Sequence, residues 1–570
     1  MCNATIPDLI LSVTLALLPL ACGGATSAPP EPKPLTVSAL PVIDGNAVMQ
    51  HVKVLASDEY EGRAPGSRGE ELSVAYMENQ LKQLGLKPGN TDGTYVQKVP
   101  LVGITVQDAP VLSFRTGGRR QDLKWKDDYV AWTKRVVEAV SVSNSEMVFV
   151  GYGVQAPEFN WDDYKGVDLK GKTMVVLVGD PPVPDPANPA ALDPKTFGGR
   201  AMTYYGRWSY KYEMGAKMGA AAVLIVHETG PAAYPFSVVQ GKVTEQFDLV
   251  TPDKNMGRAA VEGWITLDQA KALFTAAGKD FDALKQAAVT RTFTPVPLKT
   301  TASVALKNAL RTIDSTNVVA RIEGSDPVLK DEYVIYTAHW DHFGIGPEIN
   351  GDKIYNGAMD NATGIGGVIE LARALTQVSP PPKRSILILF VTAEEQGLLG
   401  SAYYAMTPIY PLAKTAAVIN IDSLNVHGTT KDLVVVGLGN SELDDYMQRA
   451  AAEQGRVLKP DPTPEKGSYY RSDHFPFAKQ GVPALHAGGG TEYVGRPADW
   501  GLKIREDYTR NDYHKPSDEM KPDWDLSGAV QDLQLYLAVG YRVANAGTLP
   551  AWKPGTEFKA KRDEQLAQQK

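Results

Sequence analysis

Between Thr337 and Gly400 the chain reads TAHWDHFG (337–344), YNGAMDNATGIGG (355–367) and SILILFVTAEEQG (385–397). Each segment carries His or carboxylate residues, and in two of them these residues directly follow an apolar run that is typical of a buried strand. An open α/β sheet places its functional groups just outside the carboxyl ends of its strands. The stretch therefore predicts a sheet of this class, with a polar site where the strands end.

Alternating strand and helix patterns continue through the second half of the chain. We expect strands at 333–337, 386–391, 417–421, 433–436 and 482–486, separated by helices such as 364–375 and 443–453. Alternation of this kind indicates α/β architecture with a mixed, mostly parallel sheet flanked by helices, which is the predicted fold class. Nearer the N-terminus, apolar residues recur at helical spacing from 70 to 84, before the helix stop Gly85.

Residues from about 100 to 300 have a different character. Short apolar segments such as MVFVGYGV, TMVVLVGD and AAVLIVHE alternate with loops rich in Pro and Gly. This pattern predicts a β-rich domain inserted into the larger body. No cluster of potential metal ligands accompanies its strands, so we expect the insert to have no chemistry of its own. A chain of 570 residues is long enough for two or three domains.

The N-terminal segment predicts export. An apolar run from Leu9 to Ala21 ends in LPLACGG, which resembles the apolar region and cleavage zone of a signal peptide and is too short to span a bilayer. Cys22 follows a small residue, as does the lipid-modified cysteine of bacterial lipoproteins, and GGATSAPPEPKP suits a flexible tether. We expect a periplasmic protein, an outer-membrane lipoprotein with a lipid anchor, or a secreted protein. The alternative is a disordered apolar N-terminus.

Charge and cysteine content exclude several classes of protein. The net charge of -8 and the pI of about 5.6 argue against a nucleic-acid partner bound through a basic surface. Cys2 and Cys22 are the only cysteines, and both lie in the expected export segment. The remaining chain therefore contains neither a disulfide nor a thiol nucleophile, which excludes cysteine proteases and zinc sites built from cysteine.

Histidine is scarce, and its distribution points to one region. Six of the eight histidines fall between 339 and 514. A lone His after a strand is more often a satisfied polar residue than a ligand. Asp341 lies two positions after His339, however, and its carboxylate could accept the proton on the second ring nitrogen and fix the tautomer that binds a metal. The pair predicts a metal ligand more strongly than either residue alone.

Four carboxylates follow predicted strands or precede a helix. Asp360 lies in MDNATG, where it could cap the next helix or bridge two metal ions with its two oxygens. Glu394 and Glu395 follow the most apolar run of the chain. Their side chains diverge, so one could bind a metal while the other acts as a general base. The alternative is a pair of acids favoured by the dipole of a following helix. Asp422 follows the run AAVINI.

His514 completes the set, in the segment DYHKPSDE, and Asp518 is close enough in sequence to orient it. Two histidines and three carboxylates then serve as ligands, and one carboxylate remains as a base. If Asp360 bridges, each ion has three protein ligands and an open position, which is typical of catalytic zinc. Imidazole and carboxylate ligands together suit this metal. We therefore predict two zinc ions per subunit.

The order of the motifs AHWDH, DNATG, AEEQGLLGS, NIDS and YHKPSDE resembles the co-catalytic di-zinc exopeptidases of metallopeptidase family 28, which include bacterial leucine aminopeptidases and glutamate carboxypeptidase. The likeness spans roughly residues 45 to 545. It implies one zinc on His339 and Asp422, a second zinc on Glu395 and His514, and a bridge at Asp360. It also implies that Glu394 is the general acid/base and that Asp341 supports the first histidine.

Three further features follow from the resemblance. The peptide bond from Asp360 to Asn361 is expected to be cis. Tyr469, in GSYYRSDHF, matches a Tyr that helps hold the substrate carbonyl in some family members, and the adjacent Tyr470 is the alternative match. The segments VGYGVQAPEFNWDDYKGVDLKGK (150–172) and YEMGAKMGAAAVLIV (212–226) resemble a protease-associated domain. In the family this domain precedes the catalytic body and forms a wall of the substrate cleft.

The predicted organisation has five parts. They are a signal peptide and tether (1–45), the N-terminal part of the peptidase body (46–135), a protease-associated-like insert (136–300), a di-zinc catalytic domain (301–548) and a charged tail (549–570).

The leading functional hypothesis is an exported zinc aminopeptidase that acts on peptide substrates. One alternative is a carboxypeptidase or dipeptidase on the same metals. Such an enzyme needs a cation for the terminal carboxylate, and Arg471, Arg496 and Arg505 are the candidates. Glutaminyl cyclisation fits the full ligand set less well. A binding protein on an inactive scaffold would be marked by lost ligands, and none is missing.

Overall fold

The computed structural model describes residues 1, 35–241 and 245–568. Its contacts divide the chain into Met1–Leu35 and Thr36–Lys570, and the following description concerns the second unit. The expected signal segment and Cys22 lie outside the described residues. Among the described residues, no helix has the length and apolar character needed to cross a membrane.

The centre of the C-terminal half is a set of four parallel strands. Strand β16 (Tyr333–His339) pairs in parallel with β19 (Ser385–Val391) and β20 (Thr415–Asn420), and β20 pairs in parallel with β23 (Ala484–Gly489). Every residue of β16, β19 and β20 is buried, as expected for strands covered on both faces. Antiparallel pairing of β21 (Asp432–Val436) with β23 makes the sheet mixed.

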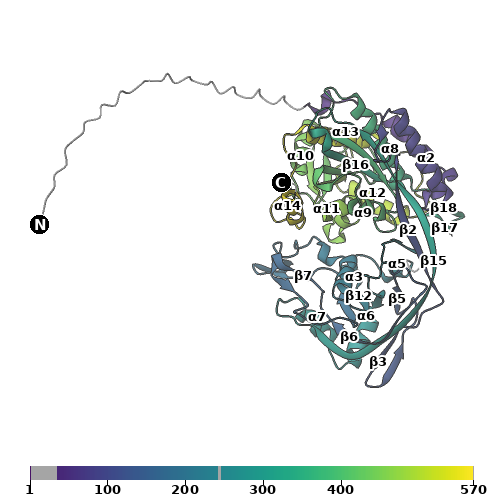
Figure 1. The fold of residues 1–570 in the computed structure, drawn as a ribbon, viewed down its shortest axis with the longest axis vertical. Coiled ribbons are helices and arrows are strands. Elements are labelled where there is room, and N and C mark those ends of the chain that lie inside the picture. The colour runs from purple at the N-terminus through teal and green to yellow at the C-terminus, as the bar shows by residue number, and fades with distance from the viewer. Residues whose placement is uncertain (2–34, 242–244, 569–570) are drawn as a thin grey trace. The chain divides into compact units, whose positions relative to one another are not determined.

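Two sets of helices cover this sheet (Figure 1). Helices α8 (Thr363–Gln377) and α13 (Ser527–Asn545) pack on each other and on β16. Helices α9 (Leu399–Met406) and α11 (His474–Lys479) also pack on each other, and α11 contacts β20 and β23. The predicted fold class, a mostly parallel sheet flanked by helices, is confirmed.

The N-terminal segment packs against this body. Helix α1 (Gly45–Leu55) contacts α8, and α2 (Arg68–Gln83) contacts β15. Between them, the turn η2 (Asp58–Arg63) carries Arg63, which is 1% exposed. Arg63 thus anchors the loop EGRAPGSRG in the interior of the molecule, while Gly66 and Arg68 of the same loop are exposed.

Strand β15 (Val296–Ile322) is 27 residues long and joins the two halves of the chain. It pairs antiparallel with β2 (Val96–Gln107) along twelve positions, from Lys307↔Gln107 to Val318↔Val96. Its end pairs antiparallel with β19, and its first part pairs with β6 (Ala139–Phe149). The chain therefore enters and leaves the segment between β2 and β15 through two adjacent strands (Figure 1).

That intervening segment continues the same sheet through β6, which pairs with β15 and β9 (Thr173–Leu177), and has its own cores. Strand β12 (Ala222–His227) pairs in parallel with β9 and β14 (Val261–Thr266), and β14 pairs antiparallel with β5 (Tyr129–Trp132). Alternate residues of β9 and β12 belong to two separate apolar clusters, as the two-residue period of a strand requires. The clusters draw on residues from Leu112 to Leu306. The predicted domain boundaries and the likeness to a protease-associated domain stay predictions.

The remaining elements are shorter or lie at the edges. In the N-terminal half they are β1 (Lys87–Pro88), β3 (Ser113–Thr116), β4 (Arg119–Asp122), β7 (Gln155–Ala156), β8 (Trp161–Asp162), β10 (Pro184–Asp185), β11 (Asn188–Leu192), α3 (Trp208–Lys217), α4 (Thr229–Ala232), α5 (Phe236–Gly241), β13 (Glu245–Leu249), α6 (Leu267–Ala276) and α7 (Phe281–Ala287). In the C-terminal half they are β17 (Gly344–Ile349), β18 (Asp352–Tyr355), α10 (Leu443–Glu453), β22 (Val457–Pro460), α12 (Trp500–Asn511) and α14 (Lys559–Ala567).

The charged tail expected from 549 onward packs on the body. Trp552 and Phe558 are buried, and the buried Arg562 of α14 donates hydrogen bonds to the carbonyls of Leu412 and Thr415. The tail therefore contributes apolar surface to the core despite its charged composition.

Candidate metal centre

All five predicted metal ligands lie at one edge of the body. His339 is the last residue of β16, Glu395 follows β19, and Asp422 follows β20. Asp360 lies just before α8, and His514 follows α12. Because parallel strands end at the same edge of a sheet, the first three side chains meet there, and the loops before α8 and after α12 bring the other two to them.

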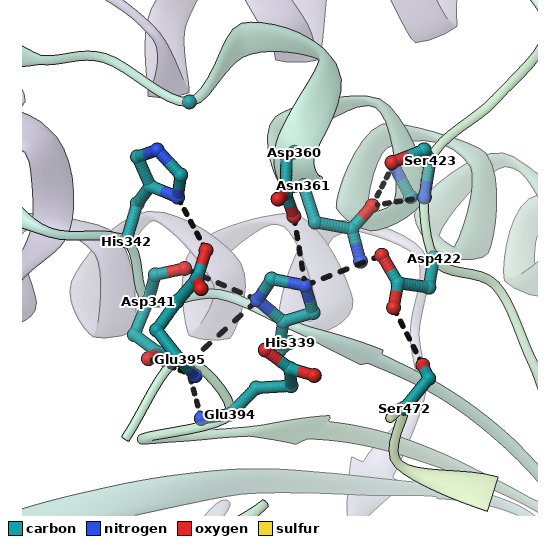
Figure 2. A network of polar contacts seen from close by, with 12 residues as sticks. His339, Asp341, His342, Asp360, Asn361, Glu394, Glu395, Asp422, Ser423 and Ser472 are labelled. Atoms are coloured by element: carbon teal, nitrogen blue, oxygen red, sulfur yellow. Dashed lines mark hydrogen bonds and ion pairs between the residues drawn. The ribbon is translucent and has the colours of Figure 1, made fainter. Parts of the chain in front are cut away.

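The two oxygens of Asp360 belong to different groups of side chains. Nε2 of His339 lies 3.2 Å from Oδ1 of Asp360 and 3.4 Å from Oδ1 of Asp422. Nε2 of His514 lies 3.4 Å from Oδ2 of Asp360 and 3.1 Å from Oε2 of Glu395. Figure 2 shows Asp360 and Asp422 facing the His339 ring. The carboxylate of Asp360 thus joins two sets, each with one histidine and one further carboxylate.

These separations fit a pair of cations. Two atoms bound about 2.0–2.1 Å from one tetrahedral zinc lie roughly 3.3–3.4 Å apart, which is close to the distances within each set. Nε2 of His339 and Nε2 of His514 are both buried, and neither has a hydrogen-bond partner among the described residues. Ligand atoms of His339, Asp360 and Glu395 lie within 4.8 Å of one another. The donor set fits two zinc ions with Asp360 as the bridge.

The charge balance of the site also favours cations. Burial opposes a positive charge on His339, but Glu394, Asp360 and Asp422 outweigh it and raise the pKa of the imidazole. Burial raises the pKa of the Asp341 carboxyl to about 8. A buried cluster with this many carboxylates requires compensating positive charge, which bound metal ions would supply.

Asp341 supports the site in a way that differs from the expected one. Nδ1 of His339 lies 3.1 Å from the backbone carbonyl of Asp341 and 3.8 Å from its carboxylate, so the carbonyl accepts the ring proton. The carboxylate instead accepts hydrogen bonds from the backbone N–H groups of Glu394 (3.0 Å) and Glu395 (3.3 Å). Asp341 therefore orients His339 through its main chain and both glutamates through its side chain.

The loop that carries Asp360 is held from two sides. The peptide bond between Asp360 and Asn361 is cis, as the resemblance implied. Asn361 donates to the carbonyl of Ile421 and accepts from the N–H of Ser423 (Figure 2). Asp518, considered as a partner of His514, accepts hydrogen bonds from the backbone N–H groups of Met359 (3.0 Å) and Asp360 (3.1 Å). Its carboxylate thus fixes the bridging residue rather than the histidine.

Sequence reasoning did not assign a role to Arg63, which holds the backbone beside two ligands. Its guanidinium donates to the carbonyl groups of Trp340, Leu55, Asn356 and Gly357 at 2.6–2.9 Å. Trp340 follows the ligand His339, and Gly357 begins the loop of Asp360. The only hint in the sequence was that this Arg lies in a loop that contains Gly and Pro. Its hydrogen-bond partners are main-chain atoms, which no sequence motif identifies.

Other supporting groups were also missed. His342, left without a role, places Nδ1 2.6 Å from Oε1 of Glu395. The hydroxyl of Ser472 donates to Oδ2 of Asp422 at 2.5 Å and accepts a hydrogen bond from the side chain of Asn420 (Figure 2). Each outer carboxylate ligand therefore has a partner that fixes its orientation.

Glu394 lies beside His339 and outside both sets of ligands (Figure 2). Its side chain makes no hydrogen bond or ion pair with any described residue. Burial raises its pKa well above the ordinary value for Glu, His339 opposes this shift, and Glu395 and Asp422 add to it. A buried carboxylate with a raised pKa next to the metal ligands is suited to accepting and releasing a proton.

The role that the resemblance implies for Tyr469 stays a prediction, and the structure shows how its side chain packs. Its ring stacks on Phe558, with centroids 5.7 Å apart, and packs edge-on against His474. Its hydroxyl is buried and has no hydrogen-bond partner among the described residues. Tyr513 is closer to the ligands, because its ring stacks on His514 with centroids 3.6 Å apart. The packing of the C-terminal tail, which supplies Phe558, accounts for the position of Tyr469.

Comparison with known proteins identifies the class to which this site belongs. Residues 317–538 match the model of peptidase family M28 and include all five predicted ligands and Glu394. This part of the chain is therefore similar to the peptidase domains of family M28.

Similar curated proteins carry related names. Leucine aminopeptidase 2 of Trichophyton rubrum is 27% identical over 215 residues, which are 35% of this chain and 39% of that protein. A probable leucine aminopeptidase 2 of Aspergillus oryzae is 30% identical over 218 residues, covering 36% and 40%. A probable zinc metalloprotease of Pyrenophora teres f. teres is 37% identical over 112 residues, covering 19% and 23%. The chain spans less than half the length of these relatives.

Among solved structures, an aminopeptidase from Aneurinibacillus sp. strain AM-1 aligns with 90% of this chain and 96% of its own, at 19% identity and a TM-score of 0.49. The zinc aminopeptidase BSAP from Bacillus subtilis aligns with 91% and 98%, at 18% identity and a TM-score of 0.42.

Proposed function

We propose that the protein is a zinc-dependent aminopeptidase that removes N-terminal residues from peptides. The observation that carries the proposal is the division of the Asp360 carboxylate between two sets, His339 with Asp422 and His514 with Glu395. The names of the relatives, leucine aminopeptidase and zinc metalloprotease, support the same reaction class.

The proposed site binds two zinc ions. His339, Asp422 and Oδ1 of Asp360 would hold one ion, and His514, Glu395 and Oδ2 of Asp360 the other. When bound, the ions supply Lewis-acid chemistry that acidifies a water molecule and polarises the scissile carbonyl.

Glu394 is the proposed general base. Its carboxylate accepts a proton from the attacking water and passes it to the amine that leaves. The hydrogen bond from its own N–H to Asp341 fixes its backbone, and burial favours the protonated form that must exist between the two transfers. Asp341 and His342 keep the ligands in place while the charge on Glu394 changes.

The proposal includes export, supported by the apolar run 9–21 and by Cys22. We expect the full chain to fractionate with a membrane when Cys22 is present, and a Cys22→Ser variant to be released into the soluble fraction. Equal distribution of both proteins would contradict a lipid anchor.

The experiment that tests the activity uses purified protein and a panel of aminoacyl chromogenic substrates beside the same compounds with blocked amines. We expect cleavage of free-amino substrates only, loss of turnover on chelation, and recovery with two equivalents of zinc per chain. Cleavage of blocked substrates, or turnover that resists the chelator, would contradict the proposal.

A further inference from the structure

The loop that carries the two glutamates of the site packs against the insert. Strand β13, from the insert, pairs antiparallel with β2 and contacts helix α9, which begins at Leu399 directly after this loop. Phe247 and Leu249 of β13 share an apolar cluster with Ala393 and Leu399, which lie on either side of the glutamates. We propose that Phe247 and Leu249 are positioning residues for Glu394, through which the insert sets the rate of peptide hydrolysis. The inference rests on the proposed function.

The loop has a constrained backbone that two hydrogen bonds close. The N–H of Leu399 donates to the carbonyl of Ala393 at 3.0 Å. The N–H of Gly400 donates to the carbonyl of Thr392 at 2.9 Å. Ala393 and Leu398 both adopt the left-handed conformation, with φ angles of 52° and 61°. Because this conformation is unfavourable for residues that have a Cβ, contacts from outside the loop must hold it in place.

The body and the insert hold the loop in different ways. The side chain of Asn317, in β15, accepts a hydrogen bond from the N–H of Thr392 (3.1 Å) and donates one to the carbonyl of Gly400 (3.0 Å). These bonds fix the two ends of the loop. The buried side chains of Ala393 and Leu399 are apolar, so only packing can hold them. Their cover comes from the ribbon formed by β2 and β15 and from β13.

Strand β13 presents one apolar face to the loop. Phe247 and Leu249 are two residues apart, so their side chains lie on the same face of the strand. Asp248, between them, lies on the other face and pairs with Arg258 of the insert at 3.1 Å. The guanidinium of Arg311 covers the ring of Phe247, 5.6 Å from its centroid, and limits the movement of the ring. The insert therefore supports the loop with a well-defined surface.

Glu394 depends on this surface more than Glu395 does. Nδ1 of His342 lies 2.6 Å from Oε1 of Glu395, whereas the side chain of Glu394 makes no hydrogen bond or ion pair with any described residue. Only its main chain is fixed, because its N–H donates to Asp341 and its carbonyl accepts from the N–H of Leu398. The position of the Glu394 carboxylate thus follows the conformation of the loop, and a misplacement of about 1 Å can reduce a rate by about 10²-fold.

The test compares two Phe→Ala substitutions in the zinc-loaded, full-length protein, with a leucine chromogenic substrate. We expect Phe247→Ala to lower kcat by about ten-fold or more, with KM changed by less than about two-fold and the zinc content of the wild type. Phe247→Leu restores most of the apolar volume and should recover most of kcat. Phe281→Ala is the matched control, because Phe281 is buried in the insert's own core. It should lower stability and leave kcat unchanged.

A second pair of variants tests the contact itself. Leu249→Ala removes a smaller side chain from the same face, should lower kcat less than Phe247→Ala does, and decides the question if Phe247→Ala does not fold. Leu399→Ala removes the other side of the contact. If both residues act through this contact, the losses of kcat in Phe247→Ala and Leu399→Ala should be less than additive, as free energies, in the double variant. Additive losses would contradict the proposed route.

Hydrogen exchange gives a readout that does not need activity. The amides of residues 393–400 should exchange faster in Phe247→Ala than in the wild type or in Phe281→Ala. Unchanged kcat and exchange in Phe247→Ala, or an equal loss of kcat in Phe281→Ala, would overturn the inference. If the wild type hydrolyses no free-amino substrate, the proposed function fails, and the exchange comparison still decides whether β13 holds the loop.

Discussion

Arg63 and Arg207 are two arginines with different surroundings: Arg63 is buried in the body, whereas Arg207 is half-buried in the insert. Burial lowers the pKa of each to about 10. Arg63, from the N-terminal segment, donates to four main-chain carbonyls, whereas the Arg207 guanidinium, from the insert, has no hydrogen-bond partner among the described residues. The fold offsets the cost of burying Arg63 with main-chain acceptors, whereas the half-buried Arg207 is held without any such contact. Arg63 therefore positions the backbone beside two predicted ligands, and Arg207 has no comparable role in the fold.

The largest effect is expected at Glu394, the proposed base, which lies beside His339 (Figure 2). Glu394→Gln removes the base but none of the metal ligands. We expect kcat to fall by about 10³-fold or more, with unchanged zinc content. Steady-state kinetics with metal analysis tests this, and an active variant with unchanged kcat would contradict the assigned role.

Substitution of Arg63 is the next most damaging change. Arg63→Met leaves four buried carbonyl groups without their donor, and we expect the free energy of unfolding to fall by about 3–5 kcal/mol. Zinc affinity should fall as well, because the backbone beside His339 and Asp360 loses its anchor. Urea denaturation and zinc titration measure the two effects. If Arg63→Met were as stable as the wild type, Arg63 would not be a structural anchor, and this distinction from Arg207 would be lost.

The pH dependence of stability that Glu70 causes tests the structural role of the N-terminal segment. Burial raises its pKa to about 7, although it accepts hydrogen bonds from the N–H of Gly66 and the hydroxyl of Ser315. Between pH 4.5 and 7 the folded state binds more protons than the unfolded state, so stability should decline as pH rises through this window and level off above it. The decline is at most about 3 kcal/mol.

The matched control for this effect is Glu70→Gln, which has the same shape and no titrating group. Thermal unfolding from pH 4.5 to 8 should show a smaller decline for the variant. Parallel curves for the two proteins would contradict a raised pKa at this position.

The smallest effect on stability is expected for the substitution of Arg207. Arg207→Gln removes a half-buried charge that makes no hydrogen bond or ion pair with the described residues, so we expect the free energy of unfolding to change by less than about 1 kcal/mol, or to rise slightly. The same urea denaturation used for Arg63→Met measures it. A loss as large as that of Arg63→Met would show that the fold depends on Arg207.

The metal centre was readable from the sequence because its parts follow strands or lie in compact motifs. His339, Glu395 and Asp422 come directly after apolar runs, and the structure places them at one edge of the sheet. The fold class was predictable for the same reason, since periodicity identifies buried strands and their alternation with helices. The ends of these elements agree with the expected ranges to within a few residues.

What the sequence did not reveal depends on contacts between distant segments. The partner of His339 is the backbone of Asp341 rather than its side chain, and main-chain acceptors leave no sequence signal. The ring of Tyr469 packs on Phe558, which lies in a tail expected to be only charged. The contact between the insert and the loop 463–471 was also not predictable, because it depends on main-chain atoms such as the carbonyl of Pro464, which accepts from the N–H of Met202.

The pairing of β2 with β15 indicates how the chain could be shortened by deleting the insert. Since the two strands that bound residues 108–306 are hydrogen-bonded neighbours, a tight two-residue turn could close them into a hairpin after that segment is deleted. The shortened chain would keep its five metal ligands, Glu394 and Arg63, and would lack Arg207. The ribbon is not the only attachment of the insert, because β13 also pairs with β2, and its Phe247 and Leu249 share an apolar cluster with Ala393 and Leu399 of the body.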